Sequence, residues 1–127
     1  MPPSASRPKQ PERQHAESFG RRSEALAAWY LRLKGYRIRD RRVKTPVGEI
    51  DLVAERLGTI VYVEVKARRR RDSDFDPLHA VNTQRIARAA QYYIARHPAL
   101  AQRTMRFDVI VLAPMTWPRH LVNAFHA

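Results

Sequence analysis

Residues 49–66 decide the fold, and they read Glu-Ile-Asp-Leu-Val-Ala-Glu-Arg-Leu-Gly-Thr-Ile-Val-Tyr-Val-Glu-Val-Lys. The runs 49–54 and 60–66 contain several β-branched residues, and the second run alternates with a period of two, which is typical of strands. Leu57-Gly58-Thr59 predicts a tight turn between them. The stretch therefore predicts a β-hairpin with antiparallel strands.

The alternation in this hairpin brings acidic and basic side chains together. Residues two apart on a strand share a face, so Glu64 and Lys66 project in one direction, as do Glu49 and Asp51 on the neighbouring strand. An acid two residues from a lysine is also common on the solvent face of a strand. A central strand in a helix-covered sheet is buried on both faces, however, and charges there need partners or a metal ion.

The sequence on either side of the hairpin predicts helices. Good helix formers precede Gly35, which favours a helix end, and a second helical segment stops before Pro98. The expected fold class is α/β, in the order α-β-β-β-α-β, with a mixed sheet flanked by helices. The expected elements are a helix over 19–34, strands over 36–43, 49–54 and 60–66, a helix over 82–97, a strand over 105–112 and a short terminal piece over 121–125.

The first predicted helix has two apolar stripes at helical spacing. Leu26, Trp29, Tyr30 and Leu33 form one of them, and we interpret Trp29 as a core residue. The second stripe is unusual because it places the carboxylate of Glu24 over small apolar residues. The other members of that stripe are Ala27, Ala28 and Leu31.

The second predicted helix separates apolar from polar residues. We interpret Tyr92 and Tyr93, like Trp29, as core residues and not as base-stacking platforms. A polar stripe beside the core face contacts a nucleic-acid backbone or simply faces water. The core face comprises Ile86, Ala90, Tyr93 and Ile94, and the polar stripe comprises Gln84, Arg85, Arg88 and Gln91.

Length and composition favour one domain, expected over residues 17–127, because 127 residues with 44% hydrophobic content suit a single core. Residues 1–16 are rich in proline and polar side chains and are expected to form a disordered basic tail. No apolar run approaches the roughly 20 residues of a membrane span, and no signal-peptide-like segment is present, which predicts a cytoplasmic protein without a membrane partner. The absence of cysteine excludes disulfides and thiolate metal sites.

The charge balance indicates a polyanionic partner. Lys and Arg number 24 against 12 Asp and Glu, a formal net charge of +12. Arginine binds phosphate through two parallel hydrogen bonds, and a basic surface binds nucleic acid by releasing counterions. A run of four arginines begins two residues after Lys66 and would grip a nucleic-acid backbone, or it forms a solvated loop. The run consists of Arg68, Arg69, Arg70 and Arg71.

Asp51, Glu64 and Lys66 together have the chemistry that phosphodiester hydrolysis needs. Magnesium takes oxygen ligands and is commonly held by one or two carboxylates, which Asp51 and Glu64 could supply. The Lys66 ammonium could orient or deprotonate an attacking water and stabilise the charge that develops on the phosphate. Glu24 offers a third acid from a separate element. These residues predict a hydrolytic centre.

This arrangement resembles the PD-(D/E)XK nuclease superfamily, whose fold is restriction-endonuclease-like. More closely, it resembles the YraN-like family of small bacterial proteins, which are related in fold to archaeal Holliday-junction resolvases. The pairing of Gly-Glu-Ile-Asp at 48–51 with Val-Glu-Val-Lys at 63–66 is specific, and the resemblance covers about residues 19–125. The other matching segments are Gly20 to Glu24, Tyr30-Leu31, Gly35-Tyr36, Thr45-Pro46-Val47, Leu52-Val53-Ala54, Ala67-Arg68 and Arg106-Phe107-Asp108-Val109.

The resemblance implies roles for the matching residues. Asp51 and Glu64 would be the first and second acidic ligands of Mg²⁺ or Mn²⁺. Lys66 would be the catalytic lysine, and Glu24 the helix glutamate that completes the metal site. Resolvase-like nucleases cut two strands, so the resemblance also makes a homodimer an expectation.

Two acids of the family motifs have alternative roles. Three positions also depart from the family pattern. Glu49 would belong to the site, bind an arginine or cap the turn. We expect Asp108 to pair with an arginine, such as Arg106 or Arg85, and not to act in the site. The departures are Arg42, where the family often has Asn, Ala67, where it often has Thr, and Asn82-Thr83, near which it usually has a lysine.

From the sequence we expect a Mg²⁺- or Mn²⁺-dependent endonuclease that acts on DNA phosphodiesters, with branched DNA among the candidate substrates. The alternative is a non-catalytic nucleic-acid-binding module that retains the nuclease fold. A third hypothesis is an interaction protein whose acidic cluster is structural. The residues do not distinguish DNA from RNA.

Overall fold

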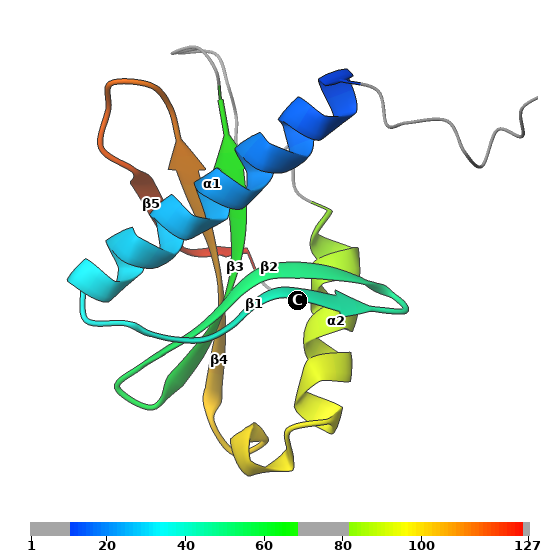
Figure 1. Cartoon of the computed structure of the whole chain (residues 1–127). Helices are drawn as coiled ribbons and strands as arrows, with labels where there is room; N and C mark the ends of the chain where they lie inside the picture. Colours follow the sequence, from blue (N-terminus) through cyan, green and yellow to red (C-terminus); the bar gives the residue numbers. More distant parts are fainter. Residues whose placement is uncertain (1–10, 69–81, 126–127) are drawn as a thin grey trace, which may run out of the picture.

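A five-stranded mixed sheet with one helix on each face forms the protein (Figure 1). The computed structural model describes residues 11–68 and 82–125, and the side chains of the first helix from residue 20 onward. In chain order the elements are α1 (Pro11–Leu33), β1 (Arg37–Thr45), β2 (Gly48–Arg56), β3 (Thr59–Ala67), α2 (Thr83–Ala95), the 3₁₀ turn η3 (Pro98–Leu100), β4 (Thr104–Leu112) and β5 (Arg119–Phe125).

The sheet confirms the predicted fold class and adds a strand to it. Its strand order is β1-β2-β3-β4-β5, with antiparallel pairs except for β3 and β4, which are parallel. A parallel pair needs a long crossover, and the chain between β3 and β4 includes α2. The predicted hairpin is present, with Arg56 opposite Thr59. The terminal piece expected over 121–125 is the edge strand β5.

Each face of the sheet has its own core, and the alternation along β3 determines the face on which each side chain lies. Val61 and Val63 pack with α1, whereas Tyr62 packs with α2. This confirms the predicted division of β3, which directs Glu64 and Lys66 to the side of α2. The predicted core face of α2 is also confirmed, since Ile86, Ala90 and Tyr93 are buried and Ile94 is partly buried.

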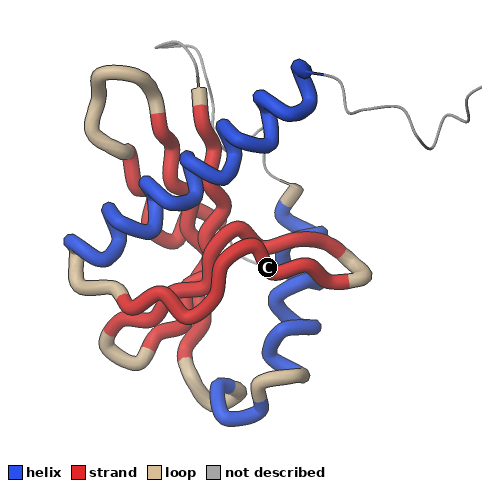
Figure 2. Tube along the Cα trace, viewed as in Figure 1, coloured by secondary structure: helices blue, strands red, loops and turns tan. Residues whose placement is uncertain are grey.

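The hairpin of β1 and β2 separates from β3 halfway along the sheet. The register of β2 with β3 ends at the pair Leu52–Val63, whereas β1 follows β2 as far as Gly48. Figure 2 shows this hairpin turning away from the direction of β3 and β4. Residues 48–51 and 64–67 therefore border a gap in the sheet.

The buried face of α1 is the stripe of mainly small residues. Ala27, Ala28 and Leu31 are fully buried, whereas Leu26, Trp29 and Leu33 are 55%, 52% and 60% exposed. The prediction that Trp29 is a core residue was therefore wrong, whereas Tyr30 is partly buried against the core. The physical reason is size, because small residues let the helix approach the sheet closely, and periodicity alone cannot choose between two apolar stripes.

The helix α1 also begins earlier than expected. It starts at Pro11, so residues 11–16, which were expected to be disordered, are helical. Proline is tolerated at the first position of a helix because the amide that it lacks would have no partner there, and good helix formers such as Glu12, Arg13 and Ala16 follow it. Residues 1–10 lie outside the described part of the chain. Among the described helices, none has the length and apolar character to cross a membrane.

The packing of α1 predicts that the same substitution will change the free energy of unfolding by different amounts at two of its alanines. Replacing Ala28 with Leu should destabilise the fold by about 1–3 kcal/mol, because the position is fully buried against the sheet and has no room for the larger side chain. Ala25→Leu is the matched control at an exposed position and should change stability by less than about 0.5 kcal/mol. Urea unfolding of the two variants measures the difference. Equal losses would contradict the packing described here.

Candidate active site

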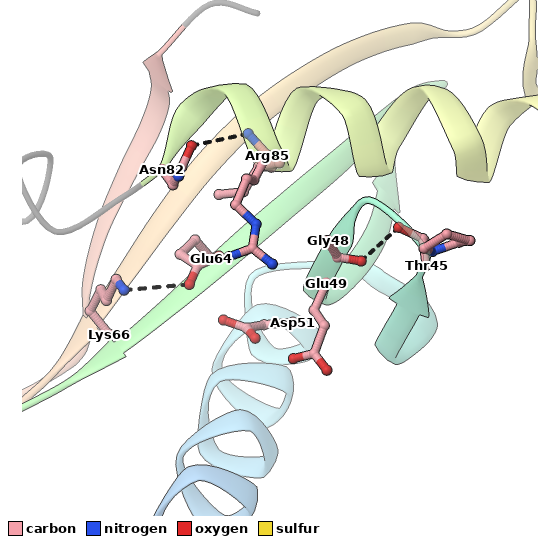
Figure 3. Close-up of a pocket in the computed structure, with 10 residues that line it drawn as sticks. Thr45, Gly48, Glu49, Asp51, Glu64, Lys66, Asn82 and Arg85 are labelled. Carbon is pink, nitrogen blue, oxygen red and sulfur yellow. Dashed lines mark hydrogen bonds and ion pairs between the residues drawn. The ribbon is translucent and has the colours of Figure 1, made fainter.

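A pocket of about 430 Å³ lies where β2 separates from β3, beneath the start of α2 (Figure 3). Three of the four residues that the sequence assigned to a metal-dependent centre, Asp51, Glu64 and Lys66, line it together. Glu49 lines it as well, at an exposed position on its rim. The remaining lining residues are Thr45, Pro46, Gly48, Asn82, Arg85 and Ile86.

The side chain of Asp51 bonds to β3 where the backbone pairing between β2 and β3 has ended. Its Oδ2 accepts a hydrogen bond of 2.7 Å from the backbone N–H of Val65, just beyond the point where β2 stops pairing with β3. Burial raises the pKa of Asp51, while the hydrogen bond from Val65 opposes that rise. The carboxylate is thus fixed by the backbone of the neighbouring strand, and it stands inside the gap.

Glu64 and Asp51 form a pair of interacting acids with a lysine beside them. They line the same pocket from neighbouring strands, and the pKa of each is raised. Burial, followed by the charge of Asp51, raises the pKa of Glu64 to about 7. Lys66 Nζ lies 3.6 Å from Glu64 Oε1. Three acids, Glu49, Asp51 and Glu64, and two cations, Lys66 and Arg85, line the pocket.

Glu24 approaches the pair from the other face of the sheet and is held by an arginine. Its Oε2 lies 3.3 Å from Arg42 Nε, yet this buried oxygen has no hydrogen-bond partner in the described part of the chain. Burial raises the pKa of Glu24, and the charge of Asp51 raises it further. Arg42 has φ of 54°, a left-handed conformation that Asn adopts more readily than Arg. This conformation is one physical reason for Asn at this position in the family that the sequence resembles.

The opposite wall of the pocket belongs to the start of α2. Asn82 caps this helix, because its Oδ1 accepts a hydrogen bond of 3.1 Å from the backbone N–H of Arg85. In Figure 3 the guanidinium of Arg85 reaches down from α2 toward the carboxylates. A Cβ on Gly48 would meet the carbonyl oxygen of Arg85 at 3.1 Å, and φ of 154° at Gly48 also favours glycine. The turn and the helix therefore approach closely.

The structure separates the other predicted site residues. Arg85 lines the pocket, whereas Gln84 and Arg88 are exposed on α2 and do not line it. The backbone N–H of Arg68 donates to the carbonyl of Leu112 at 2.7 Å, which ties the end of β3 to β4. The other members of the arginine run, Arg69, Arg70 and Arg71, lie outside the described residues.

Asp108 lies outside the pocket, and its predicted pairing with an arginine is confirmed. Arg106 binds both of its carboxylate oxygens, at 2.9 and 2.8 Å. The charged pair is a structural feature of β4. It contributes nothing to the acidic cluster.

The donor set fits a hard divalent cation better than any other metal. All candidate ligands are carboxylate oxygens, which suit Mg²⁺ and Mn²⁺. Within the described chain, no three acidic or histidine side chains already converge on one point, because Glu24 is held by Arg42. Asp51 and Glu64 alone match the common magnesium pattern of two carboxylates with several waters. The partnerless buried oxygen of Glu24 also fits a group awaiting a cation.

Sequence reasoning missed the walls of this pocket. Thr45 and Asn82 line it, but neither belongs to a periodic pattern that could have marked it as a site residue. The contact between Arg42 and Glu24 was also missed, because it joins α1 to β1 across a gap that only the folded chain defines. The one available signal was that the family which the sequence resembles often has Asn where Arg42 stands, because Asn adopts a left-handed backbone more readily.

Comparison with known proteins identifies a family. The chain matches the model of the uncharacterised protein family UPF0102 over residues 23–112, a range that contains all the acids of the pocket. A UPF0102 protein of Parvibaculum lavamentivorans is 46% identical over 110 residues, which are 87% of this chain and 83% of the relative. One from Rhodopseudomonas palustris is 44% identical over 122 residues, 96% of this chain and 94% of the relative. One from Bradyrhizobium diazoefficiens is 46% identical over 117 residues, 92% and 88% of the two chains.

Proposed function

The chain belongs to the uncharacterised protein family UPF0102, and we propose that it is a metal-dependent nuclease that cleaves phosphodiester bonds in nucleic acid, with DNA as the first candidate. The observation that carries this proposal is that Asp51, Glu64 and Lys66 line one pocket, with Lys66 beside Glu64. A formal net charge of +12 suits a nucleic-acid substrate. With this function we also propose membership of the PD-(D/E)XK superfamily.

The proposal gives a chemical task to four charged residues of the pocket and to Glu24. Asp51 and Glu64 would hold Mg²⁺ or Mn²⁺, with Glu24 as a third ligand once it leaves Arg42. The bound ion supplies charge neutralisation on the phosphate and a more acidic water. Lys66 orients the attacking water and stabilises the charge that develops on the phosphate oxygens. Arg85, on the opposite wall, binds the phosphate from above the carboxylates.

The test is a cleavage assay with substrates of different structure. Labelled linear, flapped and four-way DNA, together with RNA, are incubated with the protein in EDTA, in Mg²⁺ and in Mn²⁺. Cutting that requires a divalent ion supports the nuclease, and the preferred substrate gives its class. Sedimentation of the protein alone and with four-way DNA tests the homodimer that paired cuts would require.

A non-catalytic nucleic-acid-binding module is the second candidate. The salt bridge between Glu24 and Arg42 favours it, since an arginine already neutralises the third acid. Binding of DNA or RNA without cutting in either metal would select this candidate. Failure to bind any of these substrates at low salt would rule out both.

Metal binding has its own expected signature, independent of cleavage. At about 100 times its Kd, Mg²⁺ should stabilise the fold by about 2.7 kcal/mol, which corresponds to a rise in Tm of roughly 5–15 °C. The double variant Asp51→Asn/Glu64→Gln should lose this rise, because it removes both ligands. Glu49→Gln, which removes a charge from the exposed rim of the same pocket, is the matched control and should keep most of it. Calorimetry with and without Mg²⁺ measures the effect, and an equal rise in the double variant would refute the site.

A further inference from the structure

A second pocket, of about 360 Å³, lies on the protein surface between β1 and the C-terminal half of α2. Its volume is within the range of small-ligand sites, roughly 300–1,000 Å³. It shares Thr45 with the first pocket, so the two adjoin along the β1–β2 hairpin. Its lining residues are Asp40, Arg41, Arg42, Val43, Lys44, Thr45, Tyr92, Tyr93, Arg96 and His97.

Three aromatic rings line this second pocket, and the rings of Tyr93 and His97 stack on each other. Tyr93 is buried, donates to Asp40 Oδ2 at 2.8 Å, and stacks on His97 with ring centroids 3.9 Å apart. Tyr92 is only half-buried, and it is not the core residue that the sequence predicted. The guanidinium of Arg96 lies over its ring, 4.5 Å from the centroid. A flat group is therefore already seated on Tyr92, and nucleobases stack on the same surface.

Positive charge surrounds these rings. Arg41, Lys44 and Arg96 are exposed at the pocket. Asp40 is the one acid among the lining residues, and it accepts a hydrogen bond from the hydroxyl of Tyr93. Arg42 is paired with Glu24, so we do not assign it to a ligand. A basic groove that contains an aromatic ring able to stack on a flat group is the combination that binds single strands of nucleic acid.

We propose that the second pocket binds an unpaired nucleotide of the strand whose phosphodiester lies in the first pocket. The base stacks on Tyr92, and the flanking phosphates lie toward Arg41 and Lys44. The C-terminal end of α2 carries a partial negative charge, which favours a neutral base there and directs the phosphates to β1. The inference rests on the proposed nuclease function and narrows its substrate, because bases inside a continuous duplex are not free to stack on a side chain.

The test is a binding measurement in EDTA, where a divalent ion cannot support cleavage. The full chain is titrated with fluorescein-labelled 12-nucleotide oligo-dT, with oligo-U of the same length and with a 12-base-pair DNA duplex. Tyr92→Ala should weaken single-strand binding roughly 5- to 100-fold, the range expected for loss of one stacked base, and should affect the duplex less. Tyr92→Phe keeps the ring and should restore binding. Trp117→Ala, which removes an exposed ring beside the far edge strand β5, is the control.

The phosphates have a separate readout. Lys44→Ala should flatten the slope of log affinity against log salt by about 0.7 for a single strand, the value for one phosphate contact. Arg119→Ala, which removes a cation at the opposite edge of the sheet, should leave the slope unchanged.

The outcomes separate this inference from the proposed function. Wild-type affinity for oligo-dT and oligo-U in Tyr92→Ala would overturn the subsite, and so would an equal loss for single strand and duplex. In either case, metal-dependent cutting by the wild-type chain would leave the nuclease proposal standing. A selective loss in Tyr92→Ala without cutting in any metal would support the subsite and refute the nuclease. The stronger of the two single-strand probes distinguishes a DNA strand from an RNA strand.

Discussion

Lys66→Ala should lower kcat for metal-dependent cleavage by roughly 10²–10⁴-fold, the range expected when a positioned group of this kind is removed. Lys66 lies beside the acid pair, with Nζ 3.6 Å from Glu64 Oε1, and it shares the pocket with Asp51. Its ammonium stabilises charge that develops only in the transition state. The loss should therefore fall on kcat more than on substrate affinity.

Single-turnover cleavage and binding in EDTA separate these two effects. In Lys66→Ala, the affinity for the uncut substrate should change by less than about tenfold, because one cation among many is lost from a basic surface. Arg119→Ala, at the opposite edge of the sheet, removes a cation from outside both pockets and is the control for charge alone. If both variants cut at the wild-type rate, Lys66 has no catalytic role. If Lys66→Ala loses cutting only in proportion to binding, it is a substrate contact and not a catalytic residue.

Local alternation explains why so much of the sheet could be predicted. The period of two along residues 60–66 determined which face Glu64 and Lys66 occupy, because a strand offers each side chain only two directions. The turn at Leu57-Gly58-Thr59 then fixed the partner strand and placed Asp51 beside them. The stripe on the first helix singled out Glu24 and the resemblance assigned it to the metal site, although no local pattern connects it to the hairpin.

Packing between layers could not be predicted in the same way. Choosing the buried stripe of α1 requires knowledge of how closely the helix approaches the sheet, and that distance depends on Ala27 and Ala28 together with the residues they meet. The exposed Trp29 shows that size and hydrophobicity alone favour the wrong stripe. Likewise, the separation of β2 from β3 after Leu52 creates both the gap and its pocket, and neither strand has a proline or glycine at that point to mark it.

Asp108→Asn should destabilise the fold by about 3–5 kcal/mol, the usual cost of removing one partner from a buried ion pair. Asp108 is fully buried, and four hydrogen bonds converge on its carboxylate. Two come from Arg106, one of 2.7 Å joins it to His120 Nε2, and one of 2.8 Å comes from the backbone N–H of Asn123. The change would remove the negative charge that balances the guanidinium of Arg106, and it would replace one of the two acceptor oxygens with an amide nitrogen that cannot accept. These contacts also tie β5 to β4, so the loss should be cooperative.

The pH dependence of this loss identifies its electrostatic origin. Burial alone would raise the pKa of Asp108, but the hydrogen bonds from His120, Arg106 and Asn123 outweigh it and hold the pKa below the usual value. Its contribution to stability is therefore fully present above the unfolded pKa, about 3.9, and is lost as the pH falls through the lower folded pKa. The difference in unfolding free energy between wild type and Asp108→Asn should be constant from neutral pH to about pH 5 and shrink below about pH 4.

Urea unfolding of both chains across this pH range makes the measurement, and the difference between them removes the contributions of all other acids. Glu55→Gln is the control, since its arginine partners Arg39 and Arg103 are more exposed and the expected cost is about 0.2–1 kcal/mol. An Asp108→Asn loss as small as that of the control would contradict a buried charged network. A difference that grows toward acid would mean that Asp108 is protonated in the folded state, since only a raised pKa produces that sign.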